Sequence, residues 1–135
     1  MSVNDITNRR CLLWSIFASV ATVLLLFLLQ GNMGISLADE GYLWYGAQRT
    51  LLGEIPVLDF MSYDPGRYYW SASFMYLFNN DGIITLRIAA TAFQAIGLST
   101  GVYLVAKSQC KSYFVFLLIT ILILIIWMHP RHKLF

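Results

Sequence analysis

Two adjacent carboxylates, Asp39 and Glu40, are the residues whose type and position best suit catalysis. They follow a long apolar segment, so the sequence places them near a low-dielectric boundary. A carboxylate in such a place, beside a like charge, is a better base than one in water and can accept a proton from a hydroxyl or an amine. The alternative is structural, because acidic side chains also stabilise the N-terminus of a helix through its dipole.

Three arginines lie where they could meet an anion. Arg87 lies near the start of a second apolar segment, where it could face Asp39, and an arginine inside a membrane helix is a functional hypothesis by default. Its alternatives are a structural ion pair and snorkelling to lipid headgroups. Arg67 follows a Pro-Gly turn and could reach a lipid phosphate or ordinary headgroups. We expect Arg49 on the solvated face of its helix.

The histidines and cysteines offer little chemistry. Pro130 lies between His129 and His132 and prevents a regular helical face, and no third ligand is nearby, so the sequence predicts no metal site. No cofactor is expected. Whether the activity requires a metal ion from solution is left open. Cys11 and Cys110 are the only cysteines. Both are expected at cytoplasmic ends of helices, where thiols stay reduced.

Three apolar segments are long enough to hold the candidate residues at a membrane. Residues 12–29 contain no charge, and a helix of that length spans roughly 27 Å, which matches a hydrocarbon core. Residues 83–106 form a second predicted span and residues 113–128 a third. No A-x-A cleavage site follows the first segment, which favours an uncleaved anchor over a signal peptide.

The basic residues predict the orientation of these spans. Arg9 and Arg10 precede the first span, and the next basic residue after it is Arg49, so we expect a cytoplasmic N-terminus. The segment 31–82 is then external, or periplasmic for a bacterial inner (plasma) membrane. Residues 107–112 form a cytoplasmic loop, and the tail 129–135 is external.

The external segment is too long for a structureless loop. It holds eleven of the 21 aromatic residues and six of the seven acidic ones, and aromatic rings with a polar edge favour the headgroup level of a bilayer. Capping-box spacing at Ser36–Asp39 predicts a first interfacial helix that ends at Gly53, and a second is predicted at Arg67–Phe78. The predicted fold is an all-α membrane protein with a single membrane domain, three transmembrane helices and a long external loop.

Composition limits the function. A chain that is 59% hydrophobic and 12% charged is not an ordinary soluble domain. The net charge of +2 comes from basic residues scattered singly or in pairs, so we expect no nucleic acid partner. Membrane lipids are the expected partners.

Three stretches, Asp39–Arg49, Leu52–Phe60 and Tyr63–Tyr69, carry a family resemblance. They resemble the first external loop of GT-C fold glycosyltransferases, the superfamily that includes protein O-mannosyltransferases and the bacterial aminoarabinose transferases of lipid A. In those enzymes an acidic pair ends the first membrane helix, and membrane-parallel helices, a G-E-x-P-x-x-D-like segment and a Pro-containing turn follow. The similarity covers residues 12–106, including the order of helices and loop.

The resemblance implies that Asp39 is a general base and that Glu40 supports or replaces it. It also implies a sugar donor carried on polyprenyl phosphate and transfer with inversion at the external membrane face. Such a reaction needs cations on the leaving phosphate. The residues assigned to substrate or lipid-phosphate binding are Arg67, Arg87, Tyr63 and Tyr68.

These inferences lead to one hypothesis with two alternatives. The chain is interpreted as the N-terminal portion of a membrane glycosyltransferase that acts on a cell-envelope acceptor, and its expected partner is a missing C-terminal portion or another transferase subunit. The first alternative is a non-catalytic small membrane protein that binds a polyprenyl lipid or partners a full-length transferase. The second is a transporter or channel subunit, for which polar residues deep within the spans would be expected.

Overall fold

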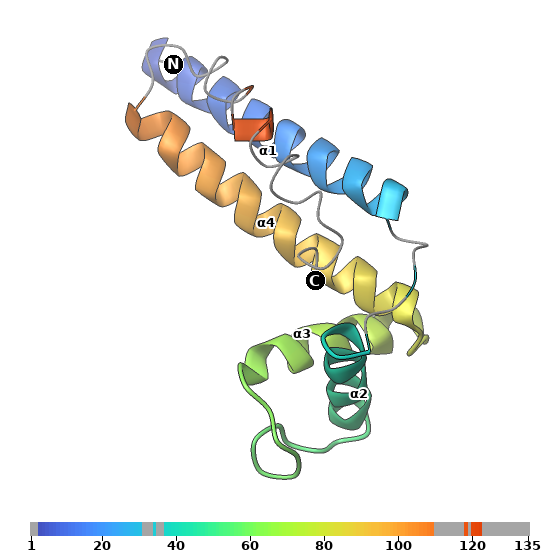
Figure 1. Ribbon diagram of the computed structural model, residues 1–135. Coiled ribbons are helices and arrows are strands. Elements are labelled where there is room, and N and C mark those ends of the chain that lie inside the picture. Colours follow the sequence, from blue (N-terminus) through green and yellow to red (C-terminus); the bar gives the residue numbers. More distant parts are fainter. Residues whose placement is uncertain (1–2, 31–33, 35–36, 110–117, 119, 123–135) are drawn as a thin grey trace. The chain divides into compact units, whose positions relative to one another are not determined.

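The computed structural model describes residues 3–30, 34, 37–109, 118 and 120–122 of the chain (Figure 1). These residues are mostly helical and contain no strand. They form two compact units. The first unit contains α1 (Val3–Gln30) and the part of α4 (Ile83–Gln109) from Thr91 onwards, and the second contains α2 (Glu40–Leu51), α3 (Pro65–Phe78) and the start of α4 up to Ala90.

Two of the helices are long and apolar enough to cross a membrane. The apolar part of α1 is Arg9–Leu29, with 21 residues, and that of α4 is Ile83–Val105, with 23 residues. The prediction of helices at 12–29 and 83–106 is therefore confirmed. Helix α4 continues through residues 107–109, so the predicted loop 107–112 begins later than expected. The third predicted span, 113–128, lies outside the described residues except for 118 and 120–122, which are helical.

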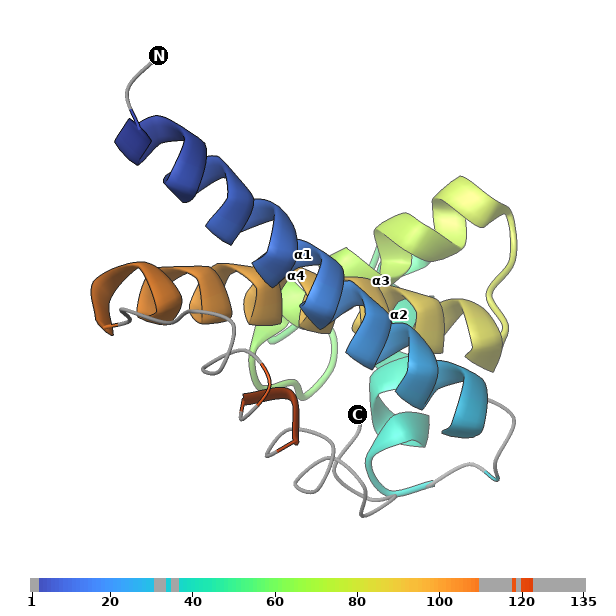
Figure 2. The same cartoon turned by 90° about the horizontal axis from the view of Figure 1, so that it is seen from above.

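The first unit places α1 beside α4, and the view from above shows the two helices crossing (Figure 2). Leu26 of α1 packs there against Leu98 of α4. The buried face of α1 carries small hydroxyl side chains, at Ser15, Ser19 and Thr22, whereas most of its leucines are exposed. The Ser15 hydroxyl donates to the Cys11 carbonyl at 2.8 Å.

The second unit is built on the contact between α2 and α3. Its core consists of Ala47, Met75 and Leu86, one residue from each of the three helices. The tryptophans of α2 and α3 bind the backbone around α4, because Trp44 Nε1 donates to the Asp81 carbonyl at 2.6 Å and Trp70 Nε1 to the Ala89 carbonyl at 2.8 Å. The start of the second candidate span is therefore an integral part of this unit.

Helices α2 and α3 approach closely because Gly46 has no side chain. A Cβ atom at Gly46 would lie 2.5 Å from Cδ1 of Tyr68 and 3.1 Å from Cε2 of Phe60, and closer still to Cε1 of Tyr68. The Tyr68 ring fills this position and is fully buried. It also meets the Phe60 ring edge to face, with 5.5 Å between centroids.

Helices α2 and α3 begin a few residues away from their predicted starts. Residues 37–39 form a turn, and α2 begins at Glu40 with Asp39 as its N-cap residue, so the predicted capping box is wrong in register. Ser36 lies outside the described residues. Helix α3 begins at Pro65, two residues before the predicted start, because proline fits the first turn of a helix. It ends at Phe78 as predicted, where Asn79 adopts the left-handed conformation.

Candidate functional site

A buried ion pair joins the first residue of α2 to α4. Arg87 donates from Nε to Oε1 of Glu40 at 2.6 Å and from Nη2 to Oε2 at 2.9 Å. Both side chains are only 4% exposed. This two-point geometry is the strong form of an arginine–carboxylate contact. Arg87 Nη2 also donates to the Gly34 carbonyl at 3.4 Å, which brings the segment before α2 to the same guanidinium.

The pair decides between the roles expected for Arg87 and corrects the partner expected for it. Of the readings left open for Arg87, the structure shows an ion pair, but its partner is Glu40 rather than Asp39. Glu40 is buried and engaged through both carboxylate oxygens. A charge in such surroundings is tolerated because its counterion lies beside it. The pair therefore fixes the start of α2 against α4.

Asp39 stands immediately before this pair and is exposed. Its carbonyl accepts the Leu43 amide at 3.2 Å, whereas its carboxylate makes no capping hydrogen bond to the helix. The fold thus anchors the backbone of Asp39 through its neighbour and leaves the residue exposed to solvent.

The three residues around the turn before α3 are placed differently from one another. Tyr63 and Arg67 are exposed, and the Arg67 guanidinium carbon lies 5.7 Å from the centre of the Tyr68 ring. Tyr68 is buried between α2 and α3, and its hydroxyl has no hydrogen-bond partner among the described residues. Burial, assisted by the neighbouring Tyr42, raises the pKa of the Tyr68 hydroxyl above its ordinary value. The structure gives Tyr68 a packing role, and Tyr63 and Arg67 remain accessible.

A second polar cluster surrounds Arg49, which was expected to be a solvated residue. Its Nε donates to Glu54, and Nη1 donates to the Tyr45 hydroxyl at 2.8 Å. The guanidinium carbon lies 5.5 Å from the centre of the Tyr45 ring and 5.6 Å from that of Phe60. The hydrogen bond to Glu54 is the main cause that raises the pKa of Arg49.

This second cluster borders a cavity of about 310 Å³ that is lined by Tyr42, Tyr45, Gly46, Arg49, Asp59, Phe60 and Met61. The spacing of residues in the sequence could have predicted the cluster around Arg49. Tyr45 and Arg49 are four residues apart on α2, and Gly53 turns the chain so that Glu54 follows the end of the helix. The positive φ of 97° at Gly53 suits glycine and brings the Glu54 amide to the Arg49 carbonyl at 3.1 Å.

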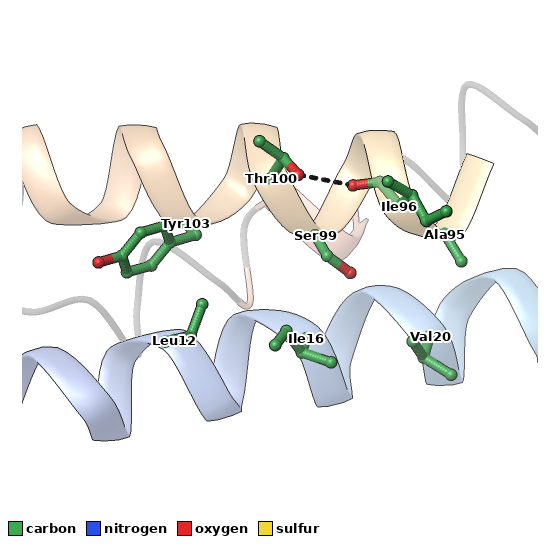
Figure 3. Close-up of a pocket in the computed structure, with 8 residues that line it drawn as sticks. All are labelled: Leu12, Ile16, Val20, Ala95, Ile96, Ser99, Thr100 and Tyr103. Atoms are coloured by element: carbon green, nitrogen blue, oxygen red, sulfur yellow. Dashed lines mark hydrogen bonds between the residues drawn. The ribbon is translucent and has the colours of Figure 1, made fainter. Parts of the chain in front are cut away.

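The first unit contains an apolar groove of about 370 Å³ between α1 and α4 (Figure 3). Leu12, Ile16 and Val20 line the groove on the α1 side, and Figure 3 shows the Leu12 side chain pointing toward α4. The residues of α4 that line it are Ala95, Ile96, Ser99, Thr100 and Tyr103. The Thr100 hydroxyl is occupied, since it donates to the Ile96 carbonyl at 2.9 Å. The groove suits a hydrocarbon chain better than a polar ligand.

The described part of the chain contains no group of three or more histidine, cysteine or acidic side chains that could hold a metal ion. His129 and His132 lie outside the described residues, as does Cys110. Cys11 is a buried free thiol on α1. No known protein family model, curated protein or solved structure matches this chain.

Proposed function

We propose that this chain is the N-terminal portion of a membrane glycosyltransferase of GT-C type, with Asp39 as the catalytic base. The observation that supports the proposal is the difference in burial and bonding between the two adjacent acidic residues. Glu40 is buried and bound to Arg87, whereas Asp39 is exposed and its carboxylate makes no capping bond. A base must reach the proton that it removes, and only one of the two carboxylates is free to do so.

The reaction would proceed by direct displacement at the anomeric carbon of the donor sugar. Asp39 accepts the proton of the acceptor hydroxyl or amine, whose oxygen or nitrogen forms the new bond to that carbon. The bond from the anomeric carbon to the phosphate oxygen breaks, and the electron pair leaves with polyprenyl phosphate. Positioning and base catalysis together account for this step without a covalent intermediate.

The leaving phosphate gains negative charge and needs a cation. Arg87 is engaged by Glu40 through two hydrogen bonds, so its charge already balances a carboxylate. Arg67 is exposed on the first turn of α3, and it stands in the same unit as Asp39. We therefore assign the phosphate contact to Arg67, with the exposed Tyr63 hydroxyl as a neighbouring donor. Arg87 becomes a positioning residue.

The same elements suit the external face of a bacterial inner membrane. Helices α1 and α4 are long and apolar enough to span it, and Arg9 and Arg10 favour a cytoplasmic N-terminus. With that orientation, residues 31–82 and the Asp39 carboxylate face the periplasm, where envelope acceptors lie.

A second candidate function is lipid binding without catalysis, and the groove between α1 and α4 favours it. An isoprenoid chain is apolar and flexible enough to occupy a groove of this lining. The candidates differ in what they require of Asp39. A lipid-binding accessory protein does not need a base, and its affinity for polyprenyl phosphate would not change in an Asp39→Asn variant.

The test is transfer of radiolabelled sugar from polyprenyl-phosphate donors to envelope acceptors in membranes that contain the chain in its native context. Asp39→Asn should lower the rate by roughly 10²–10⁴-fold, the usual contribution of a general base. The matched control is Asp64→Asn, because Asp64 is also an exposed residue that precedes a helix without a side-chain cap bond. Donor binding with no transfer by the wild type would support the lipid-binding function instead.

A further inference from the structure

Residues 52–61, here called the apolar turn, display hydrophobic side chains to the outside. Leu52 is 82% exposed, Leu58 is 77% exposed and Met61 is 79% exposed. Val57 is also exposed. A soluble surface carries such residues singly, whereas these come from one short segment.

The turn has a defined conformation. The Val57 amide donates to the Phe60 carbonyl at 3.0 Å, and the amides of Leu58 and Asp59 donate to the Ile55 carbonyl at 3.2 and 2.9 Å. Pro56, in contrast to its neighbours, is buried and forms an isolated bridge with Phe60. The turn thus holds its apolar side chains outward through its own backbone hydrogen bonds.

Val57 adds a sign of strain to this conformation. Its φ is 76°, in the left-handed region that β-branched residues avoid. Such a backbone is strained and is commonly retained where it positions a functional segment. Glycine would adopt this angle without strain but would remove an apolar side chain from the tip.

The acidic groups of the turn are bound at its base. Glu54 pairs with Arg49, and the Asp59 carboxylate accepts the Ile55 amide at 2.7 Å. Each of these bonds offsets part of the cost of bringing a carboxylate near an apolar medium. The tip between them, at Val57 and Leu58, carries no charge.

Helix α4 connects the unit that contains the apolar turn to a candidate membrane span. The start of α4 is packed into this unit through Leu86, and the candidate span begins at Ile83. If α4 crosses a bilayer, the unit lies at the level where the helix enters it. We propose that the apolar turn inserts into the outer leaflet of the lipid bilayer, with Leu58 and Val57 below the headgroups. The proposal rests on the membrane part of the proposed function and is independent of sugar transfer.

Site-directed spin labelling tests this insertion. The protein, with Cys11→Ala and Cys110→Ala, is reconstituted in phosphatidylcholine and phosphatidylglycerol vesicles and labelled at Leu58→Cys. Collisions of the label with oxygen, which enters the bilayer, are compared with collisions with a water-soluble nickel chelate. The logarithm of their ratio should be positive at position 58. A matched label at Gly66→Cys, an exposed position where an added Cβ meets no atom within 4 Å, should give a lower value than the label at position 58.

A third label separates this proposal from its premise. Leu24 is an exposed residue within the span of α1, and Leu24→Cys should report hydrocarbon if the spans cross the bilayer. A hydrocarbon value at Leu24 with an aqueous value at Leu58 overturns the insertion alone. An aqueous value at Leu24 overturns the membrane premise and the insertion with it. A Leu58 label shielded from both reagents would show that protein covers the turn, which also overturns insertion.

Discussion

Replacing Glu40 with glutamine tests whether the acidic pair is divided between structure and catalysis. Glu40→Gln leaves the Arg87 guanidinium 4% exposed, with a neutral partner in place of its counterion. Removing one member of a buried ion pair costs about 3–5 kcal/mol. The glutamine oxygen can still accept one of the two hydrogen bonds, so we expect the lower end, about 3 kcal/mol. Because each 1.4 kcal/mol changes an equilibrium constant about tenfold, the unfolding equilibrium constant should rise more than hundredfold.

The assay is unfolding in mixed detergent micelles, followed by far-ultraviolet circular dichroism. Asp39→Asn is the matched control, since it makes the same chemical change at the adjacent exposed carboxylate, and it should lie within about 0.5 kcal/mol of the wild type. The double variant Glu40→Met/Arg87→Met should recover most of the lost stability, because an apolar pair can replace a buried ion pair. Equal stability of Glu40→Gln and the wild type would show that the buried pair does not hold the start of α2 in place.

Further predictions concern packing, titration and phosphate binding. Gly46→Ala should lower the free energy of unfolding by about 1–3 kcal/mol because the added Cβ overlaps the Tyr68 ring, whereas Gly66→Ala, which has open space, should not destabilise the protein. Burial raises the pKa of Tyr68 in the folded state. The neutral Tyr68 side chain therefore contributes fully to stability below about pH 10, and this contribution is lost as the pH rises through the pKa of the folded state. Tyr68→Phe should therefore reduce the alkaline loss of stability in a pH titration of unfolding. Arg67→Gln should weaken binding of a polyprenyl-phosphate sugar, measured by titration calorimetry, without a change in far-ultraviolet circular dichroism; unchanged affinity would contradict the phosphate role of Arg67.

The helices of the second unit were predictable because their signals are local. The Asp64-Pro65-Gly66 turn and the Asn79-Asn80 pair bracket α3, and each acts through backbone preferences of the residues concerned. The long apolar runs likewise predict α1 and α4 directly. The start of α2 was misplaced because Asp39 fits a helix as an N-cap residue and also as a residue of the first turn.

The partner of Arg87 was not predictable from the sequence. Successive residues of a helix point in directions about 100° apart, so Asp39 and Glu40 cannot both face the same group. Which one faces Arg87 depends on the register of α2 and on packing across 47 positions of sequence. The pairing of Arg49 with Glu54 depended in the same way on the turn at Gly53, whose positive φ brings the two side chains together.

The role of Asp39 as the base is tested by the sugar-transfer rate per folded molecule of Asp39→Asn, with the folded fraction measured on the same preparation. The folded fraction should equal that of the wild type, and the rate should be roughly 10²–10⁴-fold lower. Full activity in folded Asp39→Asn would contradict this role, because the exposed carboxylate before the Glu40–Arg87 pair would then not be the base.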